Sequence, residues 1–384
     1  MTADLRIRLG MVGGGEGAFI GGVHRMAARL DDRYVLVAGA LSSTPEKSKR
    51  SSAALGMDIA RSYGSYADMF ATERQRPDAV EAVSIVTPNS SHADIAVAAL
   101  AAGFHVLCDK PLCTTSADAQ RIAYAVTASG LIFAVTYNYT GYPMVREARA
   151  LVRDGAIGRV RVVQVEYAQE WLAEPLEDTG QKQAAWRTDP SQSGPGGATG
   201  DIGTHAFQLA EFITGDAVSE LCADLQSFVP GRRVDDNAHV MLRFASGARG
   251  SLWASQVAPG NENALRIRIY GEAGGLEWEQ EHPNQLRVAE LGKAPRVHTR
   301  GSGLAHADAQ RVTRVPGGHP EGYLEAFATI YSEVADAIQA RRTGAASATA
   351  VFPGIQDGVR GVAFISAALR SSQTNASWVR VDGT

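Results

Sequence analysis

The first 140 residues alternate between short apolar runs and amphipathic segments. Five runs have the composition of buried strands: 7–12, 34–41, 82–86, 104–108 and 131–136. The segments between them have helical patterns: 21–30, 45–55, 65–72, 93–102 and 116–129. Strands separated by helices at this spacing predict βαβ units on a parallel sheet. We therefore expect residues 1–140 to form a doubly wound α/β domain.

After residue 140 the pattern changes. A helix is expected near 145–154, followed by strand-like segments joined mostly by short turns: 160–167, 221–228, 238–244, 249–254, 265–270, 275–279 and 286–290. This succession predicts a large, open, mostly antiparallel sheet. A glycine-rich loop at 191–200 precedes a helix near 203–214, and two late helices are expected at 321–342 and 354–371. Residues 292–320 are polar and glycine-rich and are interpreted as a surface loop or flap, so 141–384 forms a second α/β domain.

Composition narrows the class of protein. The 384 residues are 45% hydrophobic, and 37 Lys and Arg face 41 Asp and Glu. A slightly acidic chain offers no basic surface for nucleic acid or an anionic membrane. Apolar runs stay short of the ~18 residues of a membrane span, and the N-terminal segment has no signal-peptide core. Three cysteines fit a reducing cytosol, so we expect a cytoplasmic globular protein.

A glycine cluster follows the first predicted strand. Gly13, Gly15 and Ala18 match the dinucleotide pattern Gly-x-Gly-x-x-Gly/Ala. Gly13 is expected to make the tight turn, Gly15 to let the backbone approach a pyrophosphate, and Ala18 to let helix and strand pack closely. A plain glycine turn is the alternative. The residues expected to contact a cofactor here are Gly13, Gly15, Glu16, Gly17, Ala18, Phe19 and Ile20.

The end of the second strand normally carries an acid that binds the adenosine ribose. This chain has Ser42, Ser43 and Thr44 there, with Lys47 beyond. Hydroxyls and a nearby cation accept a 2′-phosphate, which an acid would repel, so Ser42, Ser43 and Lys47 favour NADP slightly over NAD. Lys47 on a solvated helix face is the alternative.

Polar residues also follow two later strands. Thr87-Pro88-Asn89 and Asp109-Lys110-Pro111 lie at carboxyl ends of parallel strands, where α/β sheets bind ligands. Lys110 can bond a substrate hydroxyl and help an alcohol become a carbonyl; a solvated surface lysine is the alternative.

Asp201 and His205 follow the glycine-rich loop, four residues apart, so a helix would place them on one face. A carboxylate can orient a histidine that takes a proton near neutral pH. Two ligands make a zinc site improbable, and a helix cap by Asp201 is the structural alternative.

The tyrosines of 137–142 can stack on a sugar ring or belong to the core.

In this order, the motifs resemble the glucose–fructose oxidoreductase/inositol dehydrogenase (Gfo/Idh/MocA) family across nearly the whole chain. The resemblance implies an N-terminal Rossmann domain and a C-terminal α/β domain whose open sheet commonly makes oligomer contacts. It also implies NAD- or NADP-dependent oxidation of a sugar, inositol or related polyol. The chain departs from the family at Asp109, where a Glu is usual, and at Ser42, where NAD-preferring members carry an acid.

Carried over to this sequence, the resemblance implies catalytic roles for Lys110, Asp201 and His205. Further expected cofactor contacts are Thr87, Pro88, Asn89, His92, Asp109, Lys110, Asn138, Trp186 and Arg187. Candidate substrate contacts are Tyr139, Trp171, Asp189 and His319.

We expect a dehydrogenase in which His205 takes the hydroxyl proton, Asp201 orients His205, and Lys110 stabilises the alkoxide. Two alternatives remain: a glycoside-processing enzyme that oxidises its substrate transiently with bound nicotinamide, and a non-catalytic sugar sensor. No metal is expected. Few helices are available to cover the second sheet, which predicts a homodimer or homotetramer.

Overall fold

The computed structural model describes residues 6–302, 306–344 and 351–382. The chain forms two compact units: unit 1 contains 1–113, 117–138 and 324–358, and unit 2 contains 114–116, 139–323 and 359–384. The chain first enters unit 2 at 114–116, returns to unit 1 for 117–138, and enters unit 2 again at 139. Residues 324–358, however, return to unit 1, and nothing in their local pattern indicated this.

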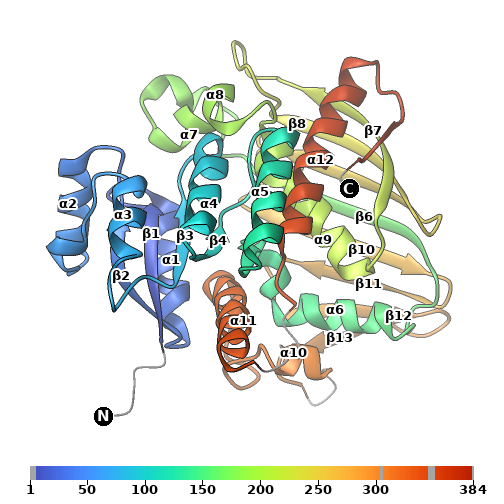
Figure 1. The fold of residues 1–384 in the computed structure, drawn as a ribbon. Helices are drawn as coiled ribbons and strands as arrows, with labels where there is room; N and C mark the ends of the chain where they lie inside the picture. Colours follow the sequence, from blue (N-terminus) through green and yellow to red (C-terminus); the bar gives the residue numbers. More distant parts are fainter. Residues whose placement is uncertain (1–5, 303–305, 345–350, 383–384) are drawn as a thin grey trace. The chain divides into compact units, whose positions relative to one another are not determined.

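A five-stranded parallel sheet lies at the centre of unit 1 (Figure 1). Its strands are β1 (Ile7–Gly13), β2 (Tyr34–Ala40), β3 (Ala82–Val86), β4 (His105–Cys108) and β5 (Phe133–Val135), in the order β2-β1-β3-β4-β5. The order reverses between β1 and β3, and ligands bind α/β sheets at such a switch point. The helices are α1 (Phe19–Leu30), α2 (Pro45–Ala54), α3 (Tyr66–Glu73), α4 (His92–Ala101) and α5 (Ser116–Ser129). The expected Rossmann-type fold is confirmed.

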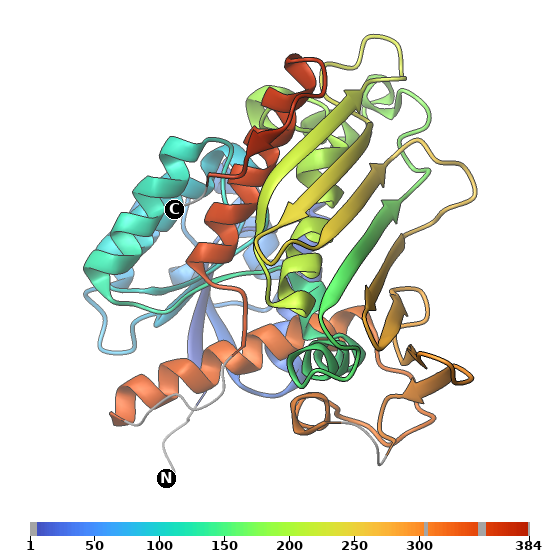
Figure 2. The same cartoon turned by 90° about the vertical axis from the view of Figure 1, so that its right-hand side faces the viewer.

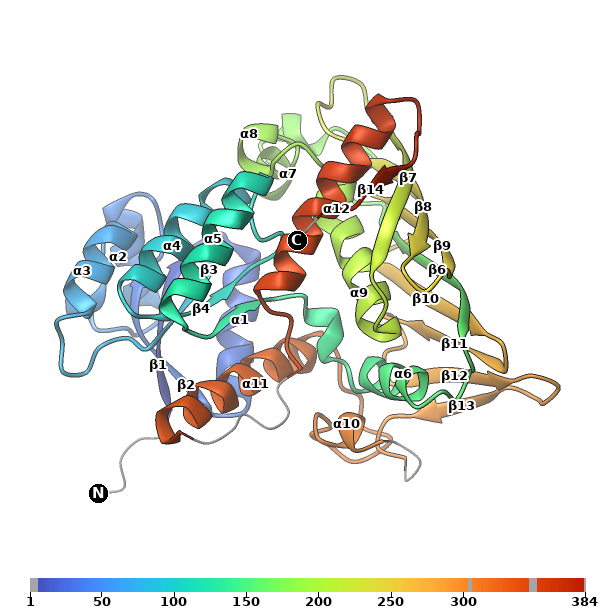
Figure 3. The same ribbon diagram turned by 45° about the vertical axis from the view of Figure 1, so that its right-hand side comes forward.

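Helix α11 (Tyr323–Thr343) packs beside α1 in unit 1 (Figures 1 and 3). The Tyr331 hydroxyl lies 2.9 Å from Nδ1 of His24 and 3.0 Å from the Ser84 hydroxyl. The Tyr34 hydroxyl donates to the Tyr331 carbonyl at 2.8 Å. These buried polar contacts join α11 to α1, β2 and β3, which explains why α11 belongs to this unit.

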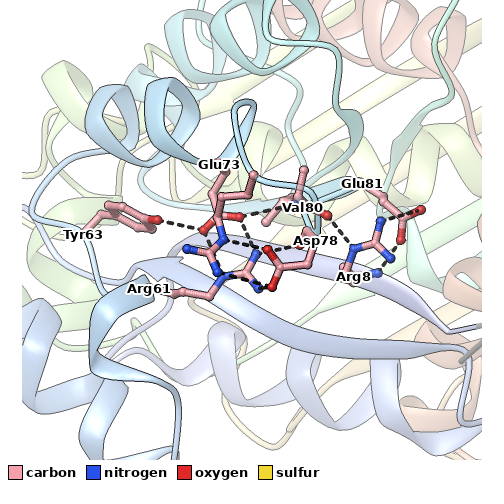
Figure 4. Close-up of polar contacts among 9 residues, drawn as sticks. Arg8, Arg61, Tyr63, Glu73, Asp78, Val80 and Glu81 are labelled. Atoms are coloured by element: carbon pink, nitrogen blue, oxygen red, sulfur yellow. Dashed lines mark hydrogen bonds and ion pairs between the residues drawn. The ribbon is translucent and has the colours of Figure 1, made fainter.

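A buried ion pair fixes the edge of unit 1 near α3 (Figure 4). Arg61, which is 5% exposed, donates through Nε to Glu73 Oε1 at 3.0 Å, and Glu73 is fully buried. The Tyr63 hydroxyl donates to the same oxygen at 2.8 Å, and the Val80 amide donates to Oε2 at 3.3 Å. Burial and the Glu73 hydrogen bond raise the pKa of Tyr63 to about 12. The Glu73 carboxylate thus ties together three separate segments of the chain.

Unit 2 contains a nine-stranded sheet in the order β13-β12-β11-β10-β6-β9-β8-β7-β14. The strands are β6 (Val160–Ala168), β7 (Val218–Gln226), β8 (Asn237–Phe244), β9 (Arg249–Ser255), β10 (Ala264–Gly271), β11 (Gly274–Glu279), β12 (Gln285–Glu290), β13 (Arg296–Thr299) and β14 (Val379–Arg380). Of the neighbouring strands in this sheet, β6 and β9 run parallel, and every other neighbouring pair runs antiparallel. The expected large, mostly antiparallel sheet is confirmed.

Helices cover one face of this sheet. Figures 2 and 3 show α6 (Pro143–Arg153), α9 (Thr204–Thr214) and α12 (Ile355–Gln373) on the same side. Along β8, inward residues are buried, whereas His239 and Met241 point outward and are exposed. Between β6 and α9 the chain forms short helices that were not expected: η4 (Leu176–Thr179), α7 (Lys182–Arg187) and α8 (Pro190–Ser193).

Residues 292–320 are more ordered than the surface loop we expected. They contain β13 and α10 (Ala307–Gln310), while 303–305 lie outside the described residues. Arg300 is 3% exposed and donates to Glu321 Oε1 at 2.8 Å and to the Val315 carbonyl at 2.6 Å. A buried arginine with several acceptors folds this polar segment back on itself, which a local polarity pattern does not reveal.

Within the described residues, no helix is long and apolar enough to cross a membrane. In the same part of the chain, no group of three His, Cys, Asp or Glu side chains is arranged to hold a metal ion.

Candidate active site

In unit 1, the glycine cluster forms a tight loop between β1 and α1. Gly13, Gly14 and Gly17 have φ of +82°, +75° and +76°, conformations that side chains rarely adopt. A Cβ on Gly13 would lie 2.8 Å from Cγ2 of Thr87, which follows β3. The loop therefore passes closely over the switch point of the sheet. Ala18 is the N-cap of α1 and has no side-chain cap, so the first amides of the helix are suited to an anion.

Two further close contacts shape this loop. Helix α1 approaches it closely at Gly21, where a Cβ would be 2.3 Å from the Gly14 Cα. Gly15 is confined by the Leu41 carbonyl and the Ser51 hydroxyl, each 2.6 Å from its would-be Cβ. The Glu16 amide donates to the Ser51 hydroxyl at 3.0 Å. Helix α2 thus holds the loop in place from the side of β2.

The segment after β2 carries the predicted ribose contacts. The Ser42 hydroxyl receives the Thr44 amide at 3.3 Å, Ser43 is exposed, and Lys47 is half-buried. Arg50 lies 3.8 Å from the Glu16 carboxylate. The local charge is therefore balanced and not strongly cationic. Phe19 is 66% exposed beside this segment, whereas Ile20 packs on a cluster of Met11, Leu41 and Val86.

His92 ties together the polar segments that follow β3 and β4. Its Nε2 lies 2.9 Å from the Thr87 carbonyl and its Nδ1 lies 3.0 Å from the Pro111 carbonyl. His92 is fully buried, so it supports the two segments, which corrects the expected direct cofactor contact. Pro88 is exposed and Asn89 is 7% exposed.

Asp109 is fixed at the end of β4. Its Oδ1 accepts from the Lys110 amide and from the Thr136 hydroxyl, each at 2.9 Å, and Nε2 of His24 lies 4.0 Å away. Burial lowers the pKa of His24 to about 4, against the opposing effect of Asp109. The half-buried Lys110 is therefore attached to a rigid backbone. Asn138, expected at the cofactor, is 1% exposed beyond β5.

In unit 2, Asp201 lies on a single π-helical turn, η5 (Thr199–Gly203), which leads directly into α9. This corrects the expected regular helix for the Asp201–His205 pair. The N-cap positions are Ala198 and Gly203, so the capping alternative for Asp201 is wrong. Single π turns occur frequently at functional sites, because the wider turn changes the direction of a side chain.

Two side chains from distant segments hold the Asp201 carboxylate. Arg187 donates through Nε to Oδ2 at 3.3 Å, and Gln256 donates through Nε2 to the same oxygen at 2.9 Å. The guanidinium of Arg187 also lies over the rings of Trp186 and Trp171, 4.4 and 5.8 Å from their centroids. Charge-assisted bonds of this kind keep a carboxylate oriented.

His205 lies in the first turn of α9 and is 7% exposed. The edge of the Tyr139 ring contacts it, with centroids 4.8 Å apart. Tyr139 also shares a short hydroxyl contact with Tyr167, which donates to Asn263 Oδ1 at 2.8 Å. Tyr139 and Tyr142 are 3% and 1% exposed, so the core alternative describes them and sugar stacking does not.

The remaining candidate substrate residues differ in their surroundings. Trp171 is half-buried, and its Nε1 donates to Gln169 Oε1 at 3.0 Å near Arg187. Asp189 is the N-cap of α8; bonds from Gln192 and Ser191 lower its pKa to about 2. His319 is exposed, and its carbonyl accepts from Arg300. Asp189 thus has a structural role as the cap of α8, and the His319 side chain stays a candidate substrate contact.

Sequence reasoning missed Gln256 and Asp235. Gln256 follows β9, and Asp235 precedes β8 and accepts the amides of Gly197 and Thr199 at 2.7 Å. A pair of acids before an alternating strand was the visible signal for Asp235. Gln256 had no local signal. Unit 2 thus presents a held carboxylate on the turn that leads into the helix of a buried histidine, two groups of the kind that transfer protons.

The comparisons with known proteins agree with this geometry. Residues 7–137 match the model of the oxidoreductase family with an NAD-binding Rossmann fold, and residues 145–277 match the GFO/IDH/MocA C-terminal domain. An oxidoreductase from Sinorhizobium meliloti is 51% identical, with a TM-score of 0.89 over 97% of this chain and 99% of that one.

Two further relatives have more specific names. An inositol dehydrogenase homolog from Azotobacter vinelandii, complexed with NADH and myo-inositol, is 37% identical with a TM-score of 0.92, covering 98% of this chain and 97% of that one. A levoglucosan dehydrogenase from Pseudarthrobacter phenanthrenivorans is 30% identical over 98% of each chain. With two family models covering most of its length and relatives along all of it, the chain belongs to the GFO/IDH/MocA oxidoreductases and is an NAD-binding dehydrogenase acting on CH–OH groups.

Proposed function

We propose that this enzyme oxidises one secondary hydroxyl of a cyclic polyol, either an inositol or a sugar. The observation that carries the proposal is the Asp201 carboxylate, held by Arg187 and Gln256 on the turn that leads into His205. A held carboxylate can accept a hydrogen bond from a neighbouring hydroxyl while it orients the histidine. The relatives crystallised with myo-inositol or levoglucosan bind cyclic ligands rich in hydroxyl groups.

The loop between β1 and α1 has the shape that a dinucleotide requires. Its three positive-φ glycines and the uncapped start of α1 present backbone amides where a pyrophosphate would bind. Residues 13–18 would hold the phosphates, and the segment after Thr87 would border the nicotinamide ribose. When bound, the nicotinamide supplies the acceptor for the substrate hydride.

The roles of the side chains follow from their chemistry. His205 accepts the proton of the reacting hydroxyl, and Asp201 orients His205 and stabilises its charged form. Lys110 bonds the same oxygen and stabilises the negative charge that develops on it. This assignment requires Lys110, Asp201 and His205 to act on one substrate molecule.

The test uses the full-length enzyme with a panel of inositols and monosaccharides, followed by absorbance of the reduced cofactor. Lys110→Ala and His205→Ala should each lower kcat by about 10²–10⁴, while cofactor binding measured by fluorescence persists. An exposed lysine, Lys293, provides the control as Lys293→Ala. Wild-type turnover by both active-site variants would overturn the assignment. Glycoside cleavage without accumulation of reduced cofactor would favour the glycoside-processing enzyme. Cofactor binding with neither reduced cofactor nor glycoside cleavage would favour the sensor.

We propose that the enzyme uses both NAD and NADP, with a preference below about tenfold. Ser42, Ser43 and Lys47 favour a 2′-phosphate, but an exposed lysine–phosphate pair contributes only about 1 kcal/mol or less. The Arg50–Glu16 contact also offsets one nearby cation. Ser42→Asp should lower kcat/KM for NADP much more than for NAD. A wild-type preference of a hundredfold for either cofactor would contradict this proposal.

We propose a homodimer or homotetramer formed through the sheet face that α6, α9 and α12 leave uncovered. Met241 and Tyr270 are 52% and 42% exposed on this face, and a cavity of about 540 Å³ lined by Phe228 and Trp253 adjoins it. On this face the exposed apolar side chains lie among charged ones such as the Arg268–Glu166 ion pair, a mixture that a two-fold contact between copies would cover. A mass of 40.7 kDa by light scattering at micromolar concentration would exclude it.

We also propose the reducing cytosol as its compartment, since Cys108, Cys113 and Cys222 are free thiols.

A further inference from the structure

Asp235 forms an unusually complete set of hydrogen bonds to the glycine-rich loop. Its Oδ1 accepts the Gly197 amide, and its Oδ2 accepts both the amide and the hydroxyl of Thr199, all at 2.7 Å. Its own carbonyl accepts the Ala198 amide at 2.7 Å. Asp235 is 8% exposed, and burial raises the pKa of its carboxyl while the bonds from Thr199 and Gly197 lower it.

These bonds continue directly to Asp201. The Gly197 carbonyl accepts the Asp201 amide at 2.8 Å, so Gly197 connects the Asp235 carboxylate to the backbone of the π turn. Gly197 must be a glycine, because a Cβ there would lie 1.9 Å from the Asp235 carbonyl oxygen. Of the glycines in this loop, Gly197 is the one that packs on Asp235, and Thr199 begins η5.

The same segment also fixes a partner of Asp201. The carbonyl of Asp236 accepts the Gln256 amide at 2.8 Å, and the Gln256 side chain donates to Asp201 Oδ2. The two residues before β8 therefore hold Asp201 through its backbone and, through Gln256, by its carboxylate.

We propose that Asp235 is a positioning residue that sets the direction of Asp201 and His205 by holding the π turn. The inference rests on the function proposed above. Asp235 does not touch the substrate; it fixes the geometry of the residues that do. A displacement of about 1 Å in such groups lowers turnover by about 10²-fold. Loss of Asp235 should thus reduce kcat far more than it reduces cofactor binding by unit 1.

The variant Asp235→Asn keeps the shape of the side chain and places an amide where two N–H donors converge. Its matched control is Asp236→Asn, the same substitution one residue later. The Asp236 carboxylate accepts the amides of Phe228 and Val229 and forms a buried ion pair with Arg232, all outside the loop that contains Asp201. The substitution keeps the Asp236 carbonyl, which is the group that accepts the Gln256 amide. We expect both variants to have a lower Tm. Asp235→Asn should lose about 10- to 100-fold in kcat, with the KM for the cofactor nearly unchanged, whereas Asp236→Asn keeps kcat within about threefold of wild type.

Two less disruptive variants, both at Thr199, test the same contact in case Asp235→Asn does not fold. Thr199→Val removes one bond to Asp235 and should lower kcat several-fold, and Thr199→Ser should recover most of that loss. Equal kcat values for Asp235→Asn and Asp236→Asn, measured per folded molecule, would show that Asp235 is merely structural and would overturn the inference.

If the wild type oxidises none of the polyols, the proposed function fails, and amide hydrogen exchange decides this inference separately. Asp235→Asn must then speed exchange at Gly197, Thr199 and Asp201, while Asp236→Asn speeds it at Phe228 and Val229. Unchanged protection of the π turn in Asp235→Asn would contradict the inference.

Discussion

The guanidinium of Arg187 bonds the Asp201 carboxylate at 3.3 Å while it stacks over the ring of Trp186, 4.4 Å from the centroid. One side chain thus joins α7 to the π turn. Stacking fixes the plane of the guanidinium, so the direction of its Nε–H is determined before substrate binds.

We predict that Arg187→Lys lowers kcat about tenfold, because lysine keeps the charge but cannot stack as a plane or direct an Nε–H at Asp201. Steady-state kinetics with the best polyol provides the measurement. Arg233→Lys is the control, since Arg233 forms an exposed ion pair with Asp189. Equal kinetics for Arg187→Lys and wild type would show that the stacking is dispensable.

The two neighbouring glycines of α1 give a matched pair for the cofactor loop. A Cβ on Gly21 would lie 2.3 Å from Gly14, whereas the nearest atom to a Cβ on Gly22 is 3.9 Å away. Gly21→Ala should displace the loop, destabilise unit 1 by about 1–3 kcal/mol and weaken NAD binding at least tenfold. Gly22→Ala should bind NAD normally and gain about 0.5–1 kcal/mol of stability. Titration calorimetry and thermal unfolding measure both; tight NAD binding by Gly21→Ala would refute the assigned packing.

The buried Glu73 carboxylate makes a prediction about stability. Glu73→Gln leaves the buried Arg61 guanidinium without its main partner, which should lower the free energy of unfolding by about 3–5 kcal/mol. Asp78→Asn removes the half-exposed partner of the same arginine and should lower the free energy of unfolding far less, because solvent screens that ion pair. Urea denaturation compares the two variants, and similar midpoints would contradict the importance we assign to burial.

His24 makes the stability of unit 1 depend on pH. Its folded pKa of about 4 lies below the ordinary 6.5, so the unfolded chain binds the proton more readily between these values. The contribution of His24 is complete above pH 6.5 and is lost as the pH falls toward 4, amounting to about 3 kcal/mol.

Thermal unfolding between pH 7 and pH 4 measures this effect. His24→Gln should flatten the fall in Tm over that window, although it lowers Tm at pH 7 by removing the bond to Tyr331. His239→Gln, at an exposed position, should leave the profile unchanged. If the Tm of His24→Gln fell between pH 7 and pH 4 as steeply as that of the wild type, another group would control the sensitivity to acid.

The periodicity of the sequence alone determined the strands and helices of both units, most of them to within about two residues. Continuous apolar runs, alternating strand patterns and amphipathic segments of period 3.6 are local properties, so β1 to β5 and β6 to β12 could be predicted without the fold. The glycine cluster, Lys110, and the Asp201 and His205 pair were likewise visible, because each stands at a strand end or helix start.

The tertiary structure alone decided what holds these groups. Arg187 and Gln256 lie 14 and 55 residues from Asp201 in the chain, and the π turn under Asp201 depends on bonds from Asp235. Likewise, α11 belongs to unit 1 because Tyr331 meets His24, 307 residues away. Such contacts join segments that are far apart in the chain, and the pattern within one segment does not specify which distant side chain will meet it.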